Sequence, residues 1–134
     1  MKIYFSGSIR GGRQDAKVYN ELIKEIKNHG EVLTEHVGAS TISDELSDED
    51  IHGQDMKWLN EADILIGEVT NPSHGVGYEI GRAVAMNKKV VCLFRNQNNR
   101  SVSAMINGSP TVQCYKYSHI EEAKKVIRQI FTDL

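Results

Sequence analysis

The fold class of this chain is decided by a short apolar stretch near its middle, Asp63-Ile64-Leu65-Ile66-Gly67-Glu68-Val69. Its apolar centre is nearly continuous and does not alternate with polar residues, which is typical of a strand covered on both faces in a parallel sheet. A turn-rich loop, Thr70-Asn71-Pro72-Ser73-His74-Gly75, follows it, and a helix is expected from about Val76 to Asn87. This order of strand, loop and helix predicts one repeating unit of a parallel α/β sheet.

The same alternation continues in both directions along the chain. Further strands are expected at Lys2–Ser6, Glu31–Thr34, Lys88–Phe94 and Val112–Tyr115. Helices are expected where apolar residues recur at helical spacing, around Val18–Ile26, Ile51–Ala62 and Ile120–Phe131. The polar, acidic segment Ala39–Asp50 has little periodicity and is expected to be a mobile loop. Strands that alternate with helices predict a doubly wound, five-stranded parallel sheet with helices on both faces.

Composition excludes several classes of protein. The 134 residues contain no linker, repeat or low-complexity tract, so a single domain over residues 1–134 is expected. Lys and Arg total 16 against 18 Asp and Glu, and the net charge of −2 argues against a general nucleic-acid-binding protein. No apolar stretch approaches the roughly 18 residues that span a membrane, and no secretory signal begins the sequence. Cysteines in apolar runs and histidines without ligand spacing predict reduced thiols, no metal site and a cytoplasmic protein, or a nuclear one in a eukaryote.

The loop after the first expected strand, Gly7-Ser8-Ile9-Arg10-Gly11-Gly12-Arg13, has the composition of an anion site. Its glycines allow backbone N–H groups to approach a phosphate, the following helix adds partial positive charge, and Arg10 or Arg13 can pair with phosphate oxygens. It matches neither the Walker A pattern nor GxGxxG. The alternative is a tight turn with surface arginines. Because ligands of such sheets bind beyond the carboxyl ends of the strands, we expect this loop and those over residues 70–75 and 96–103 to form the site.

Two carboxylates are candidates for chemistry. Glu79 follows Gly75 and Gly77 at the start of an expected helix, where each glycine costs about 1 kcal/mol unless a ligand or backbone approaches closely. In the first turn it should point to the ligand end of the sheet, although the helix dipole alone would also stabilise it there. Asp55 shares a helix face with Trp58 and should point inward, where it needs a partner; that partner is either a backbone group or a functional site. Together the two carboxylates are suited to cleaving a glycosidic bond.

Several blocks of sequence, taken together and in order, resemble the nucleoside 2-deoxyribosyltransferase superfamily, and within it the 2′-deoxynucleoside 5′-phosphate N-hydrolases. The blocks cover nearly the whole chain and are Tyr4–Arg13, Leu33–Val37, His52–Leu59, Glu68–Thr70, Pro72–Ser73, Gly75–Ala83 and Cys92–Arg95. The match is weakest over residues 39–50 and from Asn107 onward. The resemblance implies a flavodoxin-like sheet, a homodimer, no cofactor, and hydrolysis of a deoxynucleoside monophosphate to a free base and 2-deoxyribose 5-phosphate.

The resemblance also implies roles for individual residues. Glu79 would be the nucleophile that attacks C1′ to form a glycosyl-enzyme, and Asp55 would assist departure of the base. Tyr4 would lie near the nucleophile and the sugar, and His36 would lie toward the base. Ser103 would reach across the dimer interface to the 5′-phosphate. The other expected contacts to the substrate, most of them to its phosphate, are Ser6, Gly7, Ser8, Ile9, Arg10, Gly11, Ser73, Gly75 and Met105.

Other functions stay open at this stage. Related CMP hydrolases tend to carry Phe where this chain has Tyr4, which favours deoxynucleotides over ribonucleotides. A transferase of the same superfamily must hold a second base to receive the sugar, whereas a hydrolase must admit water. A non-catalytic nucleotide-binding module is the third alternative, and the presence of both Asp55 and Glu79 argues against it.

Overall fold

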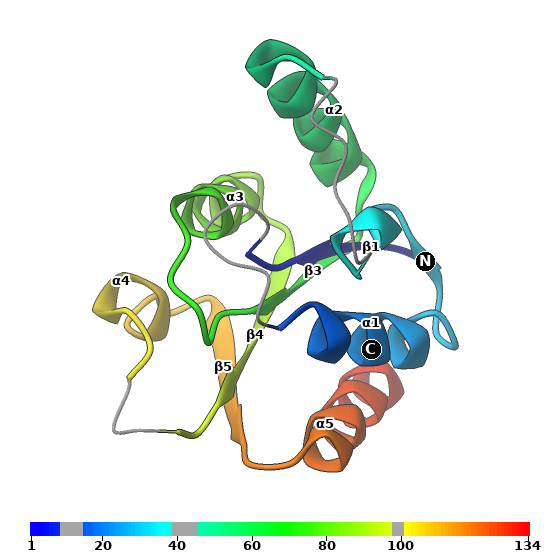
Figure 1. The fold of residues 1–134 in the computed structure, drawn as a ribbon, viewed down its shortest axis with the longest axis vertical. Coiled ribbons are helices and arrows are strands. Elements are labelled where there is room, and N and C mark those ends of the chain that lie inside the picture. The colour runs from blue at the N-terminus through cyan, green and yellow to red at the C-terminus, as the bar shows by residue number, and fades with distance from the viewer. Residues whose placement is uncertain (9–14, 39–45, 98–100) are drawn as a thin grey trace.

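Five parallel strands form one sheet in the computed structural model, which describes residues 1–8, 15–38, 46–97 and 101–134. The strands are β1 (Lys2–Ser6), β2 (Glu31–Val32), β3 (Ile64–Glu68), β4 (Lys89–Arg95) and β5 (Val112–Tyr117). Their order in the sheet is β2-β1-β3-β4-β5, and every neighbouring pair is parallel (Figure 1). This is the flavodoxin-like order, with its switch point between β1 and β3, so the predicted fold class is confirmed.

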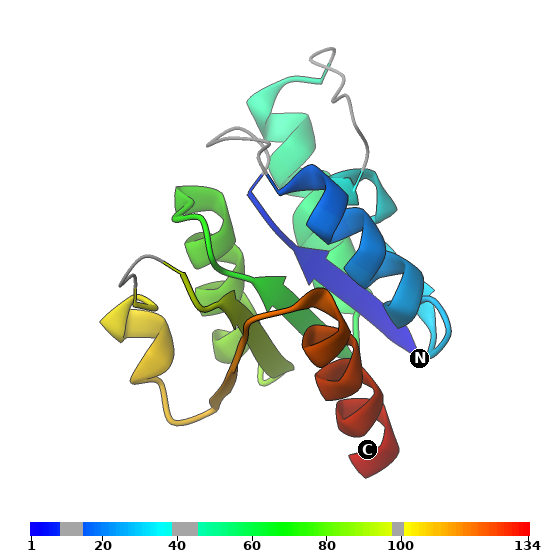
Figure 2. The same ribbon diagram turned by 60° about the horizontal axis from the view of Figure 1, so that its bottom comes forward.

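Helices cover both faces of this sheet (Figures 1 and 2). They are α1 (Ala16–Ile26), α2 (Asp48–Glu61), α3 (His74–Ala85), α4 (Ala104–Asn107) and α5 (Ile120–Asp133), with a 3-10 turn, η1, at Glu35–Gly38. Helices α1 and α5 pack together on one face, and α2, α3 and α4 pack on the other. Each face therefore has its own apolar core, as expected for a doubly wound sheet.

Strand β1 supplies side chains to both cores. Ile3 and Phe5 pack toward α1 and α5, whereas Tyr4 packs on the face that carries α2 and α3. Successive side chains of a strand point to opposite faces, so Ser6 shares the face of Tyr4. The fold therefore directs two hydroxyl groups of β1 toward the helices that carry Asp55 and Glu79.

Strand β2 is shorter than predicted. The expected strand Glu31–Thr34 ends at Val32. The hydroxyl of Thr34 accepts a hydrogen bond from the backbone N–H of Phe5 at 2.8 Å and donates one to the Phe5 carbonyl at 2.7 Å. A side chain thus takes the place of the backbone ladder, and the chain turns away into η1.

Helix α2 begins inside the segment predicted to be a loop. Asp48–Asp50 form its first turn, and the hydroxyl of Ser47 accepts a hydrogen bond from the Asp50 N–H at 3.1 Å. The acidic side chains that suggested a loop instead stabilise the positive end of a helix. Residues 39–45 of that predicted loop lie outside the described residues.

Both cysteines are free, as predicted. Cys92 and Cys114 occupy facing positions on β4 and β5. Burial raises the pKa of Cys92 to about 12, so this side chain stays a thiol and behaves as a small apolar residue. Within the described ranges no helix combines the length and the apolar character needed to cross a bilayer.

Gly30 and Gly53 provide a matched pair for a test of the packing. A Cβ atom at Gly30 would lie 2.4 Å from the Met1 carbonyl oxygen, whereas one at Gly53, on α2, would meet nothing within 4 Å. We expect Gly30→Ala to lower the free energy of unfolding by about 1–3 kcal/mol. Gly53→Ala should raise it by up to about 1 kcal/mol, because alanine favours the helix. Urea unfolding followed by circular dichroism measures both, and shifts of the same sign would contradict the expectation.

Candidate active site

The carboxylate of Glu79 is held between two hydroxyl groups of β1. The phenol of Tyr4 donates a hydrogen bond to Oε2, and Ser6 Oγ donates one to Oε1 at 2.8 Å. Tyr4 and Ser6 are each only 1% exposed. Burial raises the pKa of Glu79 to about 7, against the lowering effect of the two hydrogen bonds, and the charge of Asp55 adds to the rise. Glu79 therefore changes its charge near neutral pH, where catalytic carboxyl groups commonly operate.

Glu79 lies in the second turn of α3, not in the first turn as predicted. The helix begins at His74, two residues earlier than expected, and its first turn contains no acidic residue. Ser73 occupies the N-cap, where its hydroxyl accepts a hydrogen bond from the Val76 N–H at 3.3 Å. Because the dipole acts mainly within the first turn, it does not explain Glu79. The hydrogen bonds from Tyr4 and Ser6 of β1 explain the placement of Glu79.

Asp55 lies close enough to Tyr4 and Glu79 for its charge to raise the pKa of both. It is half-buried on α2, and burial raises its pKa, while the charges of His36 and His52 lower it. Burial and the Glu79 carboxylate raise the pKa of Tyr4 well above its ordinary value, and Asp55 contributes to that rise. The ring of His36, on η1, lies 5.6 Å from that of Trp58 on α2. The fold thus gathers four predicted residues on one side of the sheet: Tyr4, His36, Asp55 and Glu79.

The start of the predicted phosphate loop contains an unsatisfied buried hydroxyl. Ser8 is fully buried, and its backbone N–H donates to the hydroxyl of Tyr19 at 3.1 Å. Its own Oγ has no hydrogen-bond partner within the part of the chain that the structure describes, and such orphans are rare. Gly7 packs against the Tyr19 ring, where a Cβ atom would lie 3.0 Å from Cε2. The predicted contacts at residues 9–11 (Ile9, Arg10 and Gly11) lie outside the described residues.

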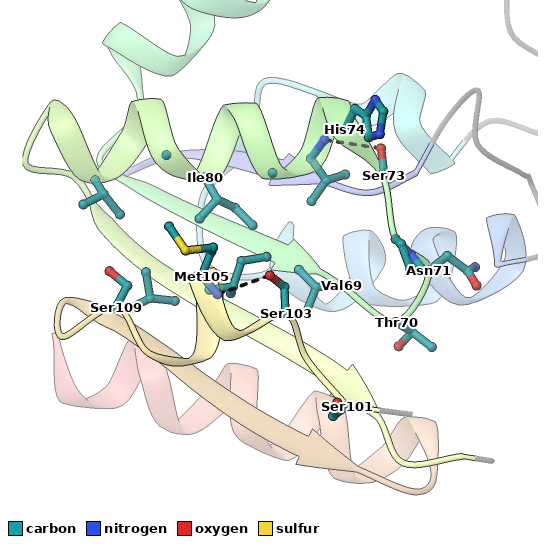
Figure 3. A pocket seen from close by; sticks show the side chains of 17 residues that line it. Val69, Thr70, Asn71, Ser73, His74, Ile80, Ser101, Ser103, Met105 and Ser109 are labelled. Carbon is teal, nitrogen blue, oxygen red and sulfur yellow. Dashed lines mark hydrogen bonds between the residues drawn. The ribbon is translucent and has the colours of Figure 1, made fainter. Parts of the chain in front are cut away.

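A cavity of about 780 Å³ runs along a different side of α3 (Figure 3). Ser73 and Ile80 line one wall, and Ser103 and Met105 line the facing wall. Tyr4, Asp55 and Glu79 are not among its lining residues. The carboxyl groups therefore lie outside the cavity lining, and of the predicted phosphate residues that the structure describes, Ser73 and Ser103 line this cavity.

The glycines of α3 do not mark a close approach within the described chain. A Cβ atom at Gly77 or Gly81 would meet nothing within 4 Å, and one at Gly75 would meet only Ser73 Oγ, at 3.8 Å. Gly77 and Gly81 line the cavity. The close backbone contact that the sequence suggested is therefore not found among these residues, and the glycines leave one side of α3 open.

Ser103 and Met105 belong to the exposed helix α4. Ser103 is its N-cap, and its hydroxyl accepts a hydrogen bond from the Met105 N–H at 3.2 Å. No residue of α4 is buried, and Met105 is 85% exposed. The alternative expected these residues to begin a short core helix: the helix forms, Val102 and Ile106 pack partly against the core, and Met105 is exposed.

The sequence analysis missed a second polar cluster at the same edge of the sheet. Asp15 accepts hydrogen bonds from Arg95 and from Asn71, and Glu68 accepts them from Tyr117 and Thr70. A carboxylate at the end of an entirely buried strand, Glu68, was the available signal. The Asp15–Arg95 pair left none, because 80 residues separate its members.

The chemistry of the arrangement comes from carboxyl groups. Glu79 is oriented by two donors, and Asp55 is a second carboxyl group whose pKa is raised. Such a pair can supply a nucleophile and an acid to a bond between them. In the described ranges no three His, Cys, Asp or Glu side chains gather as a metal-binding group.

Comparison with known proteins identifies the family. The sequence profile named nucleoside 2-deoxyribosyltransferase matches residues 3–126. The chain belongs to this family. It is 46% identical over 141 residues to a 5-hydroxymethyl-dUMP N-hydrolase of Danio rerio, covering 100% of this chain and 98% of that one. It is also 46% identical over 127 residues to the Homo sapiens protein of the same name, covering 91% and 73%. The predicted resemblance is thereby confirmed.

Solved structures show the same fold. The CMP N-glycosidase BcmB of Clostridium botulinum matches with a TM-score of 0.71 at 20% identity, covering 96% of this chain and 99% of that one. A 2-deoxyribosyltransferase of Bacillus psychrosaccharolyticus matches with a TM-score of 0.64 at 16% identity, covering 92% and 90%. At such low identities these similarities establish the fold alone.

The raised pKa of Glu79 predicts how stability depends on pH. The folded state favours the neutral carboxyl group, so its contribution is complete below about pH 4.5 and is lost as the pH rises through about 7. The free energy of unfolding of the wild type relative to Glu79→Gln should therefore fall by about 1–3 kcal/mol between pH 4.5 and pH 8. Denaturant titrations at the two pH values measure this difference. The exposed Glu61, changed to Gln, is the control; a pH-independent difference for Glu79→Gln would contradict the expectation.

Proposed function

We propose that this protein hydrolyses the N-glycosidic bond of 2′-deoxynucleoside 5′-monophosphates, releasing a free base and 2-deoxyribose 5-phosphate. The observation that carries the proposal is the pair of carboxyl groups, with Glu79 oriented by Tyr4 and Ser6 and with Asp55 beside it. Family membership and similarity along the whole chain to proteins named 5-hydroxymethyl-dUMP N-hydrolase support the substrate class.

In this mechanism Glu79 acts as the nucleophile. Its ionised carboxylate attacks C1′ as the bond from C1′ to the base breaks, and the bonding electrons leave with the base. Tyr4 and Ser6 keep the carboxylate oriented toward the sugar. Water then attacks C1′ of the glycosyl-enzyme, which releases 2-deoxyribose 5-phosphate and restores Glu79.

Asp55 assists the leaving base. A nucleobase leaves poorly as an anion, so a proton or hydrogen bond from a nearby acid lowers the barrier. Burial raises the pKa of Asp55, which keeps its proton available to a higher pH. His36 lies toward the base in this arrangement, beside Trp58.

The 5′-phosphate binds at the edge of the sheet beyond β1 and β3. The unsatisfied hydroxyl of Ser8 supports this location, since it is a buried donor without a partner in the described chain. Ser73 adds a second hydroxyl, whose oxygen accepts from Val76 and whose proton stays available. Gly7 and Gly75 flank these serines, and Ile9, Arg10 and Gly11 complete the proposed loop. These contacts do no chemistry, but they hold C1′ in line with Glu79.

A panel of nucleosides and nucleotides tests the proposal. Deoxynucleoside 5′-monophosphates should release free base, while the same deoxynucleosides without phosphate should react far more slowly, because buried donors are left unpaired. Glu79→Gln keeps the shape but removes the attacking charge, so turnover should fall by roughly 10³-fold or more while nucleotide binding persists. Chromatographic detection of free base measures the rates.

Different outcomes of this panel support different enzymes. Equal rates on nucleosides and nucleotides, or transfer of the sugar to an added base, would favour the transferases of the family. Faster release from CMP than from dCMP would favour a ribonucleotide glycosidase. Normal turnover by Glu79→Gln would remove Glu79 from the mechanism.

We also propose that the protein is a homodimer in which Ser103 of the partner subunit completes the phosphate site. Support comes from the exposed helix α4, with Met105 85% exposed, and from the partly exposed Ile106, which lines the cavity between α3 and α4. A two-fold interface buries apolar surface of this kind. A serine that caps an exposed helix is well placed to donate its proton across such an interface.

Complementation between inactive subunits tests the shared site. Glu79→Gln and Ser103→Trp should each inactivate their own homodimer. After subunit exchange, the mixed dimer contains one site with both wild-type residues, so mixing should restore up to about a quarter of wild-type activity, since about half the dimers are mixed and each has one intact site. Sedimentation verifies the dimers. An active monomer, or no recovery despite proven exchange, would contradict the shared site.

A further inference from the structure

The carboxylate of Asp15 joins three loops at the edge of the sheet where the candidate site lies. Arg95 Nη2, at the end of β4, donates to Asp15 Oδ1 at 2.9 Å and to Oδ2 at 3.1 Å. Asn71 Nδ2, in the loop after β3, donates to Oδ2 at 2.8 Å. Asp15 itself directly follows residues 9–14 along the chain and is only 5% exposed. One buried carboxylate thus connects the start of α1 with the loop after β3 and the end of β4.

Asp15 does not serve the helix that it precedes. It occupies the N-cap of α1, where aspartate usually accepts a hydrogen bond from the backbone of the first turn. Here its side chain makes no such bond. Within the described part of the chain its side chain bonds to Arg95 and Asn71, so its placement serves these segments and not helix capping.

A second buried carboxylate, that of Glu68, stabilises the loop after β3 and its link to the end of β4. Glu68, 0% exposed at the end of β3, accepts hydrogen bonds from the backbone N–H of Thr70 at 2.7 Å and from its hydroxyl at 2.9 Å. The hydroxyl of Thr70 in turn accepts one from the backbone N–H of Arg95 at 2.8 Å. Thr70 and Asn71 are neighbours on the loop that leads to Ser73 (Figure 3). Arg95 therefore has both its backbone and its side chain bonded to groups that hold this loop.

We propose that Asp15 is a positioning residue for the 5′-phosphate: through Arg95 and Asn71 it holds the start of α1, the loop after β3 and the end of β4 in the arrangement that binds the anion. The inference rests on the proposed function, because Ser8 and Ser73, which are assigned to the phosphate, lie near Asp15 and Asn71 along the chain. Ser8 precedes Asp15 by seven residues, and Ser73 follows Asn71 by two. Asp15 itself does not touch the substrate.

The negative charge of Asp15 and its role in positioning have opposite effects on anion binding, so a substitution can separate them. Asp15→Asn removes a negative charge near the proposed phosphate site, and Coulomb attraction alone would then strengthen anion binding. If Asp15 positions these segments, the same change weakens anion binding, because asparagine loses the ion pair with Arg95 and one of the two oxygens that accept from it. The sign of the change in affinity therefore separates the two roles.

Glu25 provides the matched control. It is a buried carboxylate at the other end of the same helix, 8% exposed, and it accepts hydrogen bonds from Arg128 Nε at 3.1 Å and Nη2 at 2.8 Å. Glu25→Gln removes an equivalent buried charge and ion pair far from the loops after β1, β3 and β4. A purely structural effect should therefore appear equally in both variants.

The experiment compares Asp15→Asn, Glu25→Gln and the wild type. We measure KM and kcat for a deoxynucleoside monophosphate, the Kd of inorganic phosphate by calorimetry, and the melting temperature. Asp15→Asn should raise KM and the phosphate Kd about tenfold or more, with kcat changed less than about threefold. Glu25→Gln should lower the melting temperature similarly but leave KM and the phosphate Kd unchanged.

Each outcome decides the inference. An unchanged or tighter phosphate Kd in Asp15→Asn, or an equal KM rise in Glu25→Gln, would overturn it. If the wild type hydrolyses no nucleotide, the proposed function fails and the phosphate measurements alone decide the role of Asp15; a wild type that binds no phosphate overturns that role as well. Should Asp15→Asn not fold, the half-buried Asn71→Ala carries the same test, with an expected rise in both constants of about threefold.

Discussion

The parallel pairing of β1 with β3 is the constraint on which the rest of the site depends. The register joins Ser6 to Gly67 at the carboxyl end of both strands, so the chain leaves β1 and β3 at the same edge. From there β3 leads directly into α3, and α3 brings Glu79 to the hydroxyl groups of Tyr4 and Ser6. An antiparallel neighbour would deliver its loop to the opposite edge, and the carboxylate would lie far from both donors.

Burial and hydrogen-bond partners together set the pKa values of Glu25, Glu68 and Glu79. Glu25 is bonded to Arg128 and His29, and although burial raises its pKa, these partners offset burial and the net shift is downward. Among the residues that the structure describes, the donors to Glu68 and Glu79 are neutral, namely hydroxyl groups and one backbone N–H, and the pKa values of both are raised. The charged partner therefore favours the ionised form of Glu25. Burial raises the pKa of Glu79 to about 7 against its neutral donors, so this carboxyl group can gain and lose a proton near neutral pH.

The sequence predicted those features that depend on periodicity and on local order. The apolar run of β3 indicated a parallel sheet, and the resemblance to the family predicted that Tyr4 lies near Glu79. Boundaries set by single side chains were missed: Thr34 ends β2, and Ser73 starts α3 early. Ser47, three residues before Asp50, was a readable capping pattern within an acidic segment. The bond from Arg95 to Asp15 leaves no sequence pattern, since only the folded sheet brings them together.

Helix α2 stands apart from the rest of the molecule in how it is supported. It extends away from the sheet in Figure 1, and Leu59 is its one buried residue. A hydrogen bond of 3.0 Å between His52 and Tyr78 joins it to α3. Glu79, Tyr4 and Ser6 instead rest on the packed sheet. Most substitutions on α2 therefore cost little folding free energy, whereas those around Glu79 disturb a core. In evolutionary terms, the part of the site that carries Asp55 can change for new leaving groups at little cost in folding free energy, whereas folding constrains the part that carries Glu79.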